Sequence, residues 1–190
     1  MLKWSTFLIV CLTLLAANGF AGNVLVNPGF ETGTLPPWLN TFDFCSGCTW
    51  AVTSADSNSG LYSAFVGGNR ALEQDFAAIA DPSITEASLW LKMPDTGIAA
   101  VYFLYSDATY SQNIVSVGNT WTQFDVTSFL DPTKSLVAFG VFGCTGCPGL
   151  SETFADDFVV NVVPEPGSMI LLGTGLIGAA GVARRRFLRF

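Results

Sequence analysis

The sequence predicts an all-β domain, an antiparallel β-sandwich, that lies between two apolar terminal segments. Between residues 23 and 163, short runs rich in Val, Phe, Tyr, Trp and Thr alternate with turn residues. No stretch of about 12 residues in this region shows helical periodicity. The region is also long enough for two sheets to close over one hydrophobic core. We therefore divide the chain into residues 1–21, 22–163 and 164–190.

Ten strands are expected in the central region, and they are separated mainly by Gly, Pro, Asn and Asp residues. The run 136–142 is apolar on both of its faces, which predicts a strand in the centre of a sheet. The ten expected strands span residues 23–26, 48–54, 61–66, 71–77, 84–92, 98–105, 111–117, 121–127, 136–142 and 153–162.

Two of the expected strands alternate regularly enough for their faces to be assigned. The side chains expected in the core are Leu89, Leu91, Phe124 and Val126. The side chains expected on the opposite faces are Ser88, Trp90, Lys92, Trp121, Gln123 and Asp125.

The charged residues exclude several functions. The chain has 8 Lys and Arg against 15 Asp and Glu, a formal net charge of −7, and it has no histidine. The lack of histidine excludes Ser-His-Asp and Cys-His catalysis and any imidazole-bound metal. The central region holds 14 acidic residues against three basic ones. This balance disfavours nucleic acid as a partner, because phosphate binding requires a cationic patch.

The first 21 residues have the pattern of a secretory signal peptide. Lys3 precedes an uncharged run from Trp4 to Ala17, and small residues then lead to a cleavage site near Ala21. The alternative is a retained N-terminal membrane anchor, for which the run is short. Either interpretation places the central region outside the cytoplasm.

The C-terminal segment has three parts: a Pro-Glu-Pro sequence, an uncharged stretch and an arginine cluster. The uncharged stretch, Gly167–Ala183, would span about 26 Å as a helix, near the lower limit for crossing a bilayer. Arginines favour the cytoplasmic side, which is the orientation that Lys3 also predicts. The residues of the two flanking parts are Pro164, Glu165, Pro166, Arg184, Arg185 and Arg186.

The segment Val163–Arg186 resembles the PEP-CTERM sorting signal of Gram-negative bacteria, which has the same three parts in the same order. The resemblance implies that an exosortase-type membrane protease recognises the Pro-Glu-Pro motif. It also implies transient anchoring in the inner membrane by a transmembrane helix, followed by delivery to the cell surface or to an extracellular matrix. A plain tail anchor is the alternative.

Short motifs in the central region resemble those of jelly-roll carbohydrate-binding modules. The region begins with Asn23-Val-Leu-Val-Asn27-Pro-Gly-Phe-Glu31-Thr-Gly33 and closes with Phe154-Ala-Asp-Asp157-Phe-Val-Val, with Ser59–Phe65 and Trp121–Val126 between them. The resemblance implies a jelly-roll sandwich and one structural calcium ion, held by Glu31 and Asp157. Carboxylates are ligands that calcium accepts. The alternative is that Asp156 and Asp157 are solvated charges that protect a strand edge.

A sugar site needs aromatic faces with amides and carboxylates beside them. The candidate ligand-binding residues are Trp90, Trp121, Gln123 and Asp125, provided that their strands share a sheet. The loop residues Trp38 and Trp50 are alternatives. The competing interpretation of all these tryptophans is that they cover the edges of the core.

Four cysteines remain once the signal peptide is removed, and an even number in an exported protein predicts disulfides. Local pairing of Cys45 with Cys48 and of Cys144 with Cys147 is favoured over the two crossed arrangements, which would close loops of about 100 residues. A zinc site of four thiolates and a redox role are the alternatives.

No catalytic residues are assigned. Asp156 and Asp157 are adjacent in an expected strand, so their side chains should point to opposite faces and cannot flank one glycosidic bond. The sequence therefore predicts an exported, non-catalytic protein of the cell surface or biofilm matrix that binds carbohydrate, with exopolysaccharide as the expected ligand. The alternatives are a structural matrix protein without specific glycan binding and a secreted glycoside hydrolase with a carboxylate pair.

Overall fold

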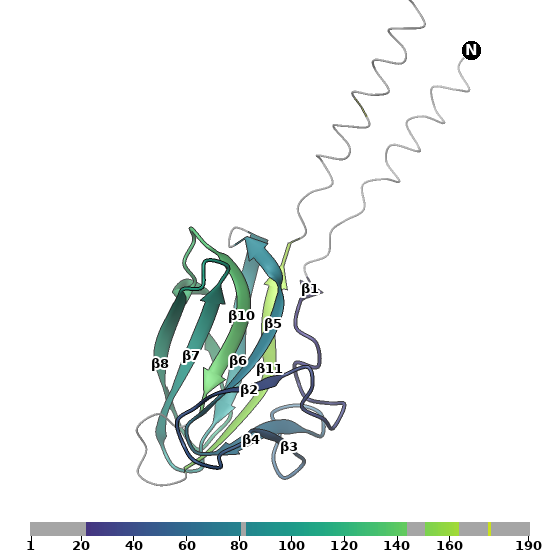
Figure 1. Cartoon of the computed structure of the whole chain (residues 1–190). Helices are drawn as coiled ribbons and strands as arrows, with labels where there is room; N and C mark the ends of the chain where they lie inside the picture. The colour runs from purple at the N-terminus through teal and green to yellow at the C-terminus, as the bar shows by residue number, and fades with distance from the viewer. Residues whose placement is uncertain (1–21, 81–82, 144–150, 164–174, 176–190) are drawn as a thin grey trace, which may run out of the picture. The chain divides into compact units, whose positions relative to one another are not determined.

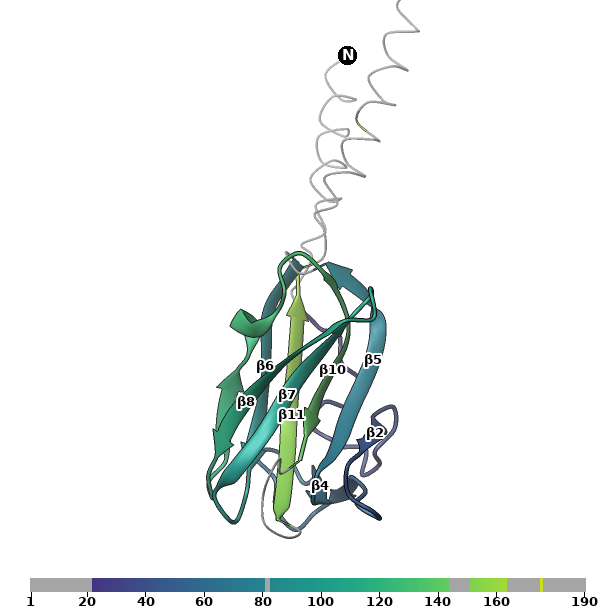
Figure 2. The ribbon, with the colours of Figure 1, turned by 60° about the vertical axis from the view of Figure 1, so that its left-hand side comes forward.

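The computed structural model describes residues 22–80, 83–143 and 151–163, together with Gly175. Residues Gly22–Val162 form a compact unit of two antiparallel sheets packed face to face, which confirms the predicted all-β sandwich (Figures 1 and 2). Within these residues, no helix is long and apolar enough to cross a membrane. The expected signal peptide, transmembrane helix and Pro-Glu-Pro motif lie outside the described residues.

One sheet has six strands, in the order β3-β4-β11-β6-β9, with β1 also paired to β11. The first and last residues of the compact unit are partners in this sheet, because Gly22 pairs with Val162. A short 3-10 helix, Thr127–Phe129, follows β9. The strands are β1 (Gly22–Asn23), β3 (Ala51–Thr53), β4 (Ser63–Gly67), β6 (Ile84–Lys92), β9 (Thr122–Asp125) and β11 (Glu152–Val162).

The other sheet has five strands, in the order β2-β5-β10-β7-β8. Figure 1 shows β8, β7, β10 and β5 side by side in front of β6 and β11. The central position of β10 confirms the prediction made from its two apolar faces. The strands are β2 (Leu39–Asp43), β5 (Arg70–Ala80), β7 (Gly97–Tyr105), β8 (Tyr110–Val117) and β10 (Ser135–Phe142).

The structure differs from the expected strands at the N-terminal end of the domain. The run 23–26 does not continue as a strand, because the side chain of Gln74 binds both the N–H and the C=O of Val26, at 2.7 and 2.8 Å. The expected strand 48–54 is limited to β3, since the N–H of Trp50 donates to the side chain of Asn40 at 2.7 Å. The sequence does not predict β2, because its residues, Leu-Asn-Thr-Phe-Asp, do not alternate between apolar and polar side chains.

Aromatic rings from both sheets and from the N-terminal loop fill the core. Phe103 and Phe139 stack at 5.1 Å between centroids in the five-stranded sheet. Phe158 of β11 meets Phe139 edge-on at 5.7 Å and lies 4.5 Å from Trp38, which belongs to the loop before β2. The expected core positions of β6 and β9 are confirmed: Leu89, Leu91 and Val126 are fully buried and Phe124 packs against the core.

Gly140 allows β10 to pass directly beneath a tyrosine of β7. A Cβ atom at this position would lie 2.5 Å from Cζ of Tyr102 and 2.6 Å from the carbonyl oxygen of Leu72. The Tyr102 hydroxyl donates to Glu73 on the other side of β10, at 2.9 Å. The absence of a side chain at residue 140 therefore permits a hydrogen bond that spans three strands.

Replacement of Gly140 by Ala should lower the free energy of unfolding by about 1–3 kcal/mol, because Tyr102 must move away from Glu73. Urea denaturation measures this change. Gly67→Ala in β4 is the control, since no atom lies within 4 Å of a Cβ there, and it should change stability by less than about 0.5 kcal/mol. Equal stability of the Gly140→Ala variant and the parent chain would contradict this close approach.

Candidate functional site

The outer face of the five-stranded sheet carries most of the exposed large apolar side chains of the described residues. Cross-strand pairing places those of β2, β7 and β8 on the side away from the core, and ring contacts with Phe142 place the two Phe residues at the end of β2 on the same side. These side chains are Leu39, Phe42, Phe44, Ile98, Tyr110 and Ile114, with exposed fractions from 37% to 67%. A group of exposed apolar side chains on one face marks a binding surface more often than scattered ones do.

Four rings on this face form an aromatic group: Phe42, Phe44, Tyr102 and Phe142. Phe142 is its centre, because its centroid lies 4.9 Å from Tyr102, 5.6 Å from Phe44 and 6.0 Å from Phe42. The pairing of β2 with β5 shifts register between Thr41 and Asp43, and Phe42 has a φ of 37°. This bulge turns the ring of Phe42 onto the sheet.

An open hollow of about 200 Å³ lies beside the aromatic group. Phe44, Phe142 and Ala100 form its apolar wall, and the amides of Asn69 and Gln112 also line it. The Oδ1 atom of Asn69 is buried and has no hydrogen-bond partner within the part of the chain that the structure describes. The hollow therefore combines aromatic rings with amide groups.

Tyr102, the buried ring of the aromatic group, forms a polar pair with Glu73. Tyr102 donates to Glu73 at 2.9 Å, and its hydroxyl also contacts the hydroxyl of Thr41 at 3.3 Å. Burial raises the pKa of Glu73 and of Tyr102 above their ordinary values, and the nearby charge of Asp75 adds to both shifts. The pair ties β7 to β5 and β2 beneath the exposed rings.

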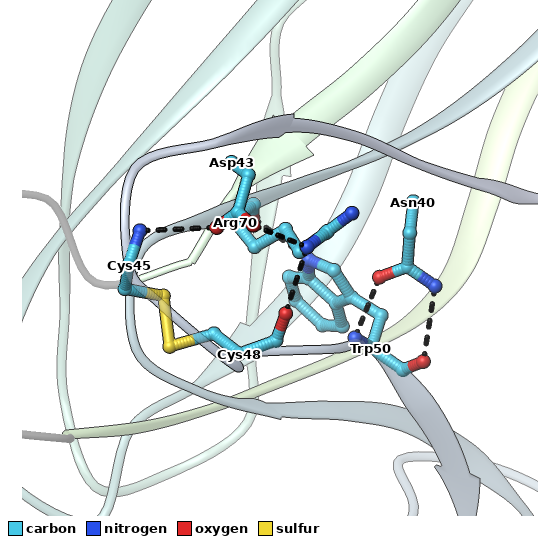
Figure 3. Close-up of a disulfide and its surroundings, with 6 residues drawn as sticks. All are labelled: Asn40, Asp43, Cys45, Cys48, Trp50 and Arg70. Atoms are coloured by element: carbon cyan, nitrogen blue, oxygen red, sulfur yellow. Dashed lines mark hydrogen bonds and ion pairs between the residues drawn. A yellow bond between two sulfur atoms is a disulfide. The ribbon is translucent and has the colours of Figure 1, made fainter.

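A disulfide between Cys45 and Cys48 lies in the loop between β2 and β3, directly after Phe44 (Figure 3). The N–H of Cys45 donates to Asp43, and Asp43 forms an ion pair with Arg70 at 3.0 Å. The same guanidinium nitrogen donates to the carbonyl of Cys48 at 3.0 Å. Arg70 thus holds the loop on both sides of the disulfide.

The predicted local pairing is present for Cys45 and Cys48. These two sulfurs are bonded to each other and do not serve as thiolate ligands for zinc. Cys144 and Cys147 lie outside the described residues, so their predicted pairing stays a prediction.

Trp38 and Trp50 are buried and do not offer a ring to a ligand, with exposed fractions of 2% and 1%. The indole N–H of Trp50 donates to the carbonyl of Arg70 at 2.8 Å, and its backbone forms two hydrogen bonds with Asn40 (Figure 3). The alternative sugar site in these loops is therefore wrong, because both rings are part of the core.

The predicted ligand-binding residues lie on the outer face of the six-stranded sheet. β6 pairs with β9, which places Trp90 directly opposite Gln123, so the condition that their strands share a sheet is met. Trp121 is half-buried, and its indole N–H donates to Asp56 at 2.9 Å. Asp125 instead accepts hydrogen bonds from the backbone and hydroxyl of Thr127, at 3.0 and 2.7 Å. Of the four predicted ligand-binding residues, the structure thus brings Trp90 and Gln123 together. The side chains of Trp121 and Asp125 instead form hydrogen bonds with Asp56 and Thr127.

Asp56 links Trp121 to the sheet. Its second carboxylate oxygen forms an ion pair with Lys92 of β6. The hydrogen bond from Lys92, with that from Trp121, holds the pKa of Asp56 below its ordinary value. This ion pair neutralises one of the three cationic side chains in the central region.

Three carboxylates surround the turn between Asn58 and Tyr62. The carboxylate of Glu31 accepts hydrogen bonds from the N–H groups of Leu61 and Tyr62, each at 3.0 Å. Asp156 accepts from the backbone N–H groups of Asn58 and Ser59, at 2.9 and 3.3 Å. Asp157 accepts from the side chains of the same two residues, both at 2.8 Å.

The expectation that Asp156 and Asp157 point to opposite faces is wrong. The pairing of β11 with β6 shifts register between Asp156 and Val159, and Asp157 has a φ of 46°. This bulge interrupts the alternation, so both carboxylates reach the same turn. Burial raises the pKa of Asp156 to about 7, and the adjacent Asp157 charge contributes to the rise.

The chemistry of this carboxylate group fits a calcium ion. A Cβ atom on Gly29 would lie 3.1 Å from an oxygen of Asp157 and 3.9 Å from Cγ of Glu31, so the chain passes between the two predicted ligands. Carboxylates and carbonyls are the ligands that calcium uses. Within the described residues, however, no three Asp, Glu or Cys side chains lie close enough together to coordinate one metal ion. Any ion held here therefore takes part of its coordination from backbone oxygens or water.

Replacement of Asp56 by Asn should lower the free energy of unfolding near neutral pH by about 1 kcal/mol, because Lys92 loses its ion pair. The pKa of Asp56 is lower in the folded than in the unfolded chain, so its stabilisation is complete above about pH 4 and is lost as the pH falls further. In urea denaturation, the difference between the two proteins should shrink below about pH 4. Asp95→Asn, at an exposed site in the β6–β7 turn, is the control. A difference that does not change with pH would argue against this ion pair.

Comparison with known proteins identifies the C-terminal segment. Residues 162–186 match the PEP-CTERM protein-sorting motif, which confirms the predicted sorting signal. This motif implies export, processing by an exosortase and sorting to the cell surface. No curated protein matches the chain in sequence.

The sandwich is similar to several solved structures. One is TmCBM61 in complex with β-1,4-galactotriose, with 19% identity and a TM-score of 0.53 over 73% of this chain and 97% of that one. Another is the CBM22-1 xylan-binding domain of Xyn10C from Paenibacillus barcinonensis, with 14% identity and a TM-score of 0.50 over 72% of this chain and 92% of that one. The enzymatically active domain of bacteriophage CBA120 tailspike protein 4 has 11% identity and a TM-score of 0.55 over 72% of this chain, but only 21% of its own length is covered. The chain thus joins a PEP-CTERM sorting motif to a sandwich with the fold of carbohydrate-binding modules.

Proposed function

We propose that the sandwich binds polysaccharide on the outer face of its five-stranded sheet after export, and that it does so without catalysis. The observation that carries this proposal is the hollow of about 200 Å³ beside Phe44 and Phe142, which is also lined by Asn69 and Gln112. Sugar rings present flat C–H surfaces that stack on aromatic side chains, while their hydroxyls need hydrogen-bond partners. The hollow supplies both kinds of group.

The polar lining suits a ligand rich in hydroxyl groups. Gln112 of β8 and Asn69 before β5 lie on either side of the apolar wall. The buried oxygen of Asn69 has no partner among the described residues, and a buried acceptor without a partner is costly. A sugar hydroxyl, or a water molecule carried with it, would satisfy this acceptor.

The sorting motif and the structural neighbours support the same function. TmCBM61 was solved with a galactotriose, and the CBM22-1 domain is a xylan-binding domain. The PEP-CTERM motif sends proteins to the cell surface, where polysaccharide is available. In our proposal, Pro164, Glu165 and Pro166 are recognised by the exosortase while the stretch 167–183 holds the chain in the inner membrane of a Gram-negative cell. The mature domain then acts at the surface or in the biofilm matrix.

The surface around Trp90 and Gln123 is a second candidate for the same ligand. It offers an aromatic ring beside an amide across two paired strands. Trp121 contributes less, since its N–H is bound to Asp56 and its ring meets the edge of Phe154. We prefer the outer face of the five-stranded sheet because Phe42 and Phe44 are more exposed than Trp90 and a hollow lies beside the rings.

The proposed absence of catalysis is supported by the environment of the adjacent acidic pair. Asp156 and Asp157 are both bound by the Asn58–Ser59 turn. Both carboxylates face the same turn of the domain, so they are poorly placed to flank one glycosidic bond as the acid and nucleophile of a glycosidase.

Replacement of Phe44 by Ala should weaken binding of the matching polysaccharide about tenfold, because one stacking ring is lost. Phe44 is 67% exposed, so the variant should keep its thermal stability. Retardation of the full-length chain in native gels that contain a soluble polysaccharide, compared across galactan, xylan and mixed-linkage glucan, measures the effect. The gels contain a polyoxyethylene detergent, because the full-length chain has apolar terminal segments and a detergent with a sugar headgroup could compete for the site.

Trp90→Ala on the six-stranded sheet is the matched control and should bind as the parent does. Loss of binding in Trp90→Ala alone would move the site to the other sheet. Unchanged binding in both variants would favour a structural matrix protein, and depolymerisation of a polysaccharide would favour a hydrolase.

We also propose that Glu31 and Asp157 hold one structural calcium ion. The ion would neutralise the carboxylates around the Asn58–Tyr62 turn and so join the first loop to β11, without taking part in a reaction.

EGTA should therefore lower the melting temperature of the parent chain, and added calcium should restore it. In Glu31→Gln, the side-chain oxygen still accepts hydrogen bonds from Leu61 and Tyr62 but the charge is lost, so EGTA should have little effect. Glu152→Gln, at the exposed start of β11, is the control and should respond as the parent does. An EGTA effect that persists in Glu31→Gln would exclude Glu31 as a ligand.

A further inference from the structure

We infer that the polysaccharide bound by this domain lacks acidic sugars. This inference rests on the proposed function and adds to it the chemical class of the ligand. It follows from where the positive charges of the domain lie and from what already binds them.

Every cationic side chain of residues 22–163 is held in an ion pair. The three are Arg70, Lys92 and Lys134, and all are described by the structure. Lys92 pairs with Asp56 on the six-stranded sheet. Lys134 lies 3.1 Å from Asp107 and 3.9 Å from Asp131, in the turns at the far ends of β7 and β10.

Arg70 is the cation nearest the hollow, because it follows Asn69 in the chain. Its guanidinium pairs with Asp43 and donates to the carbonyl of Cys48, and the side chain is only 20% exposed. Recognition of a carboxylate or sulfate by arginine requires free N–H groups that face the anion together. Nη1 makes both of these contacts and Nε is buried without a partner among the described residues, so two neighbouring nitrogens of Arg70 are not free to face an anion together.

The outer face of the five-stranded sheet itself carries negative charge. Glu73 and Asp75 are two residues apart on β5 and so lie on the same side, and register places them opposite Gly140 and Ala138 of β10. Asp75 is exposed. β10 separates β5 from β7, so the exposed Asp75 lies along one side of the surface that runs from Phe142 toward Tyr110.

An acidic polymer would place like charges beside this face. Two like charges about 4 Å apart repel by about 1 kcal/mol in water, and more where water is partly excluded. No cation among the described residues is free to offset this repulsion, since all three are paired. A neutral polymer can use the rings and amides without this cost.

The test compares neutral and uronate polymers with the full-length chain, in native gels that contain galactan, xylan, polygalacturonate or alginate and a detergent without sugar. At about 0.01 M salt, where the Debye length is about 30 Å, retardation by at least one neutral polymer should be about tenfold stronger than by either uronate polymer. At about 1 M salt the Debye length falls to about 3 Å, and the difference should narrow.

Asp75→Lys should raise the affinity for polygalacturonate several-fold at low salt and leave neutral binding within about twofold of the parent. Glu86→Lys makes the same change in net charge on the six-stranded sheet, opposite Asn161 and therefore far from the hollow, and should not have this effect. An equal effect of the two variants would mean that net charge, not this face, sets the selectivity.

Two further outcomes separate this inference from the proposed function. Binding of uronate polymers as tightly as neutral ones would overturn the inference and leave carbohydrate binding intact. Binding of no polymer of either class would remove the proposed function, and the inference with it.

Discussion

The pairing of β11 inside the six-stranded sheet is the constraint on which the rest of the domain depends. This last strand pairs with β4 and β6 and also holds β1. Its Phe158 packs against Trp38 and Phe139, and so joins the N-terminal loop to both sheets. Its Asp156 binds the backbone of Asn58, 98 positions earlier in the sequence. Such distant contacts form only after large loops close, so the core cannot be completed before the last strand is in place.

Both candidate sites lie at bulges where a residue with a side chain adopts a positive φ. Phe42 has a φ of 37° beside the hollow, and Asp157 has a φ of 46° in the carboxylate group. This conformation costs a non-glycine residue of order 1 kcal/mol or more, and it persists only where neighbours hold it. The ion pair of Asp43 with Arg70 lies next to Phe42, and two hydrogen bonds from the Asn58–Ser59 turn hold Asp157. Each site therefore depends on polar contacts made by residues that are remote in sequence.

The sequence predicts the strands well because most of them alternate clearly or are apolar on both faces, as β6 and β10 are. It also predicts that Trp90 and Gln123 face the same way, since alternation is local. It does not predict the aromatic group, because that group depends on β2 and on the pairing of β7 with β10. The shared direction of Asp156 and Asp157 depends on a positive φ, which an aspartate does not signal in the sequence. The sequence does contain one sign of this aromatic group: Phe42 and Phe44 flank Asp43 directly before the Cys45-Ser-Gly-Cys48 loop.

The pairing of Gly22 with Val162 means that the polypeptide enters and leaves the sandwich at the same pole. The hollow lies at the other pole of the sandwich. Asn69 precedes β5 and Phe142 ends β10, and these strand ends are close in sequence to Gly67 and Glu152, which pair at the far end of β11. Eleven residues of β11 separate these poles, a length of about 35 Å. An attachment through either terminal segment would therefore join the domain at the pole opposite the hollow.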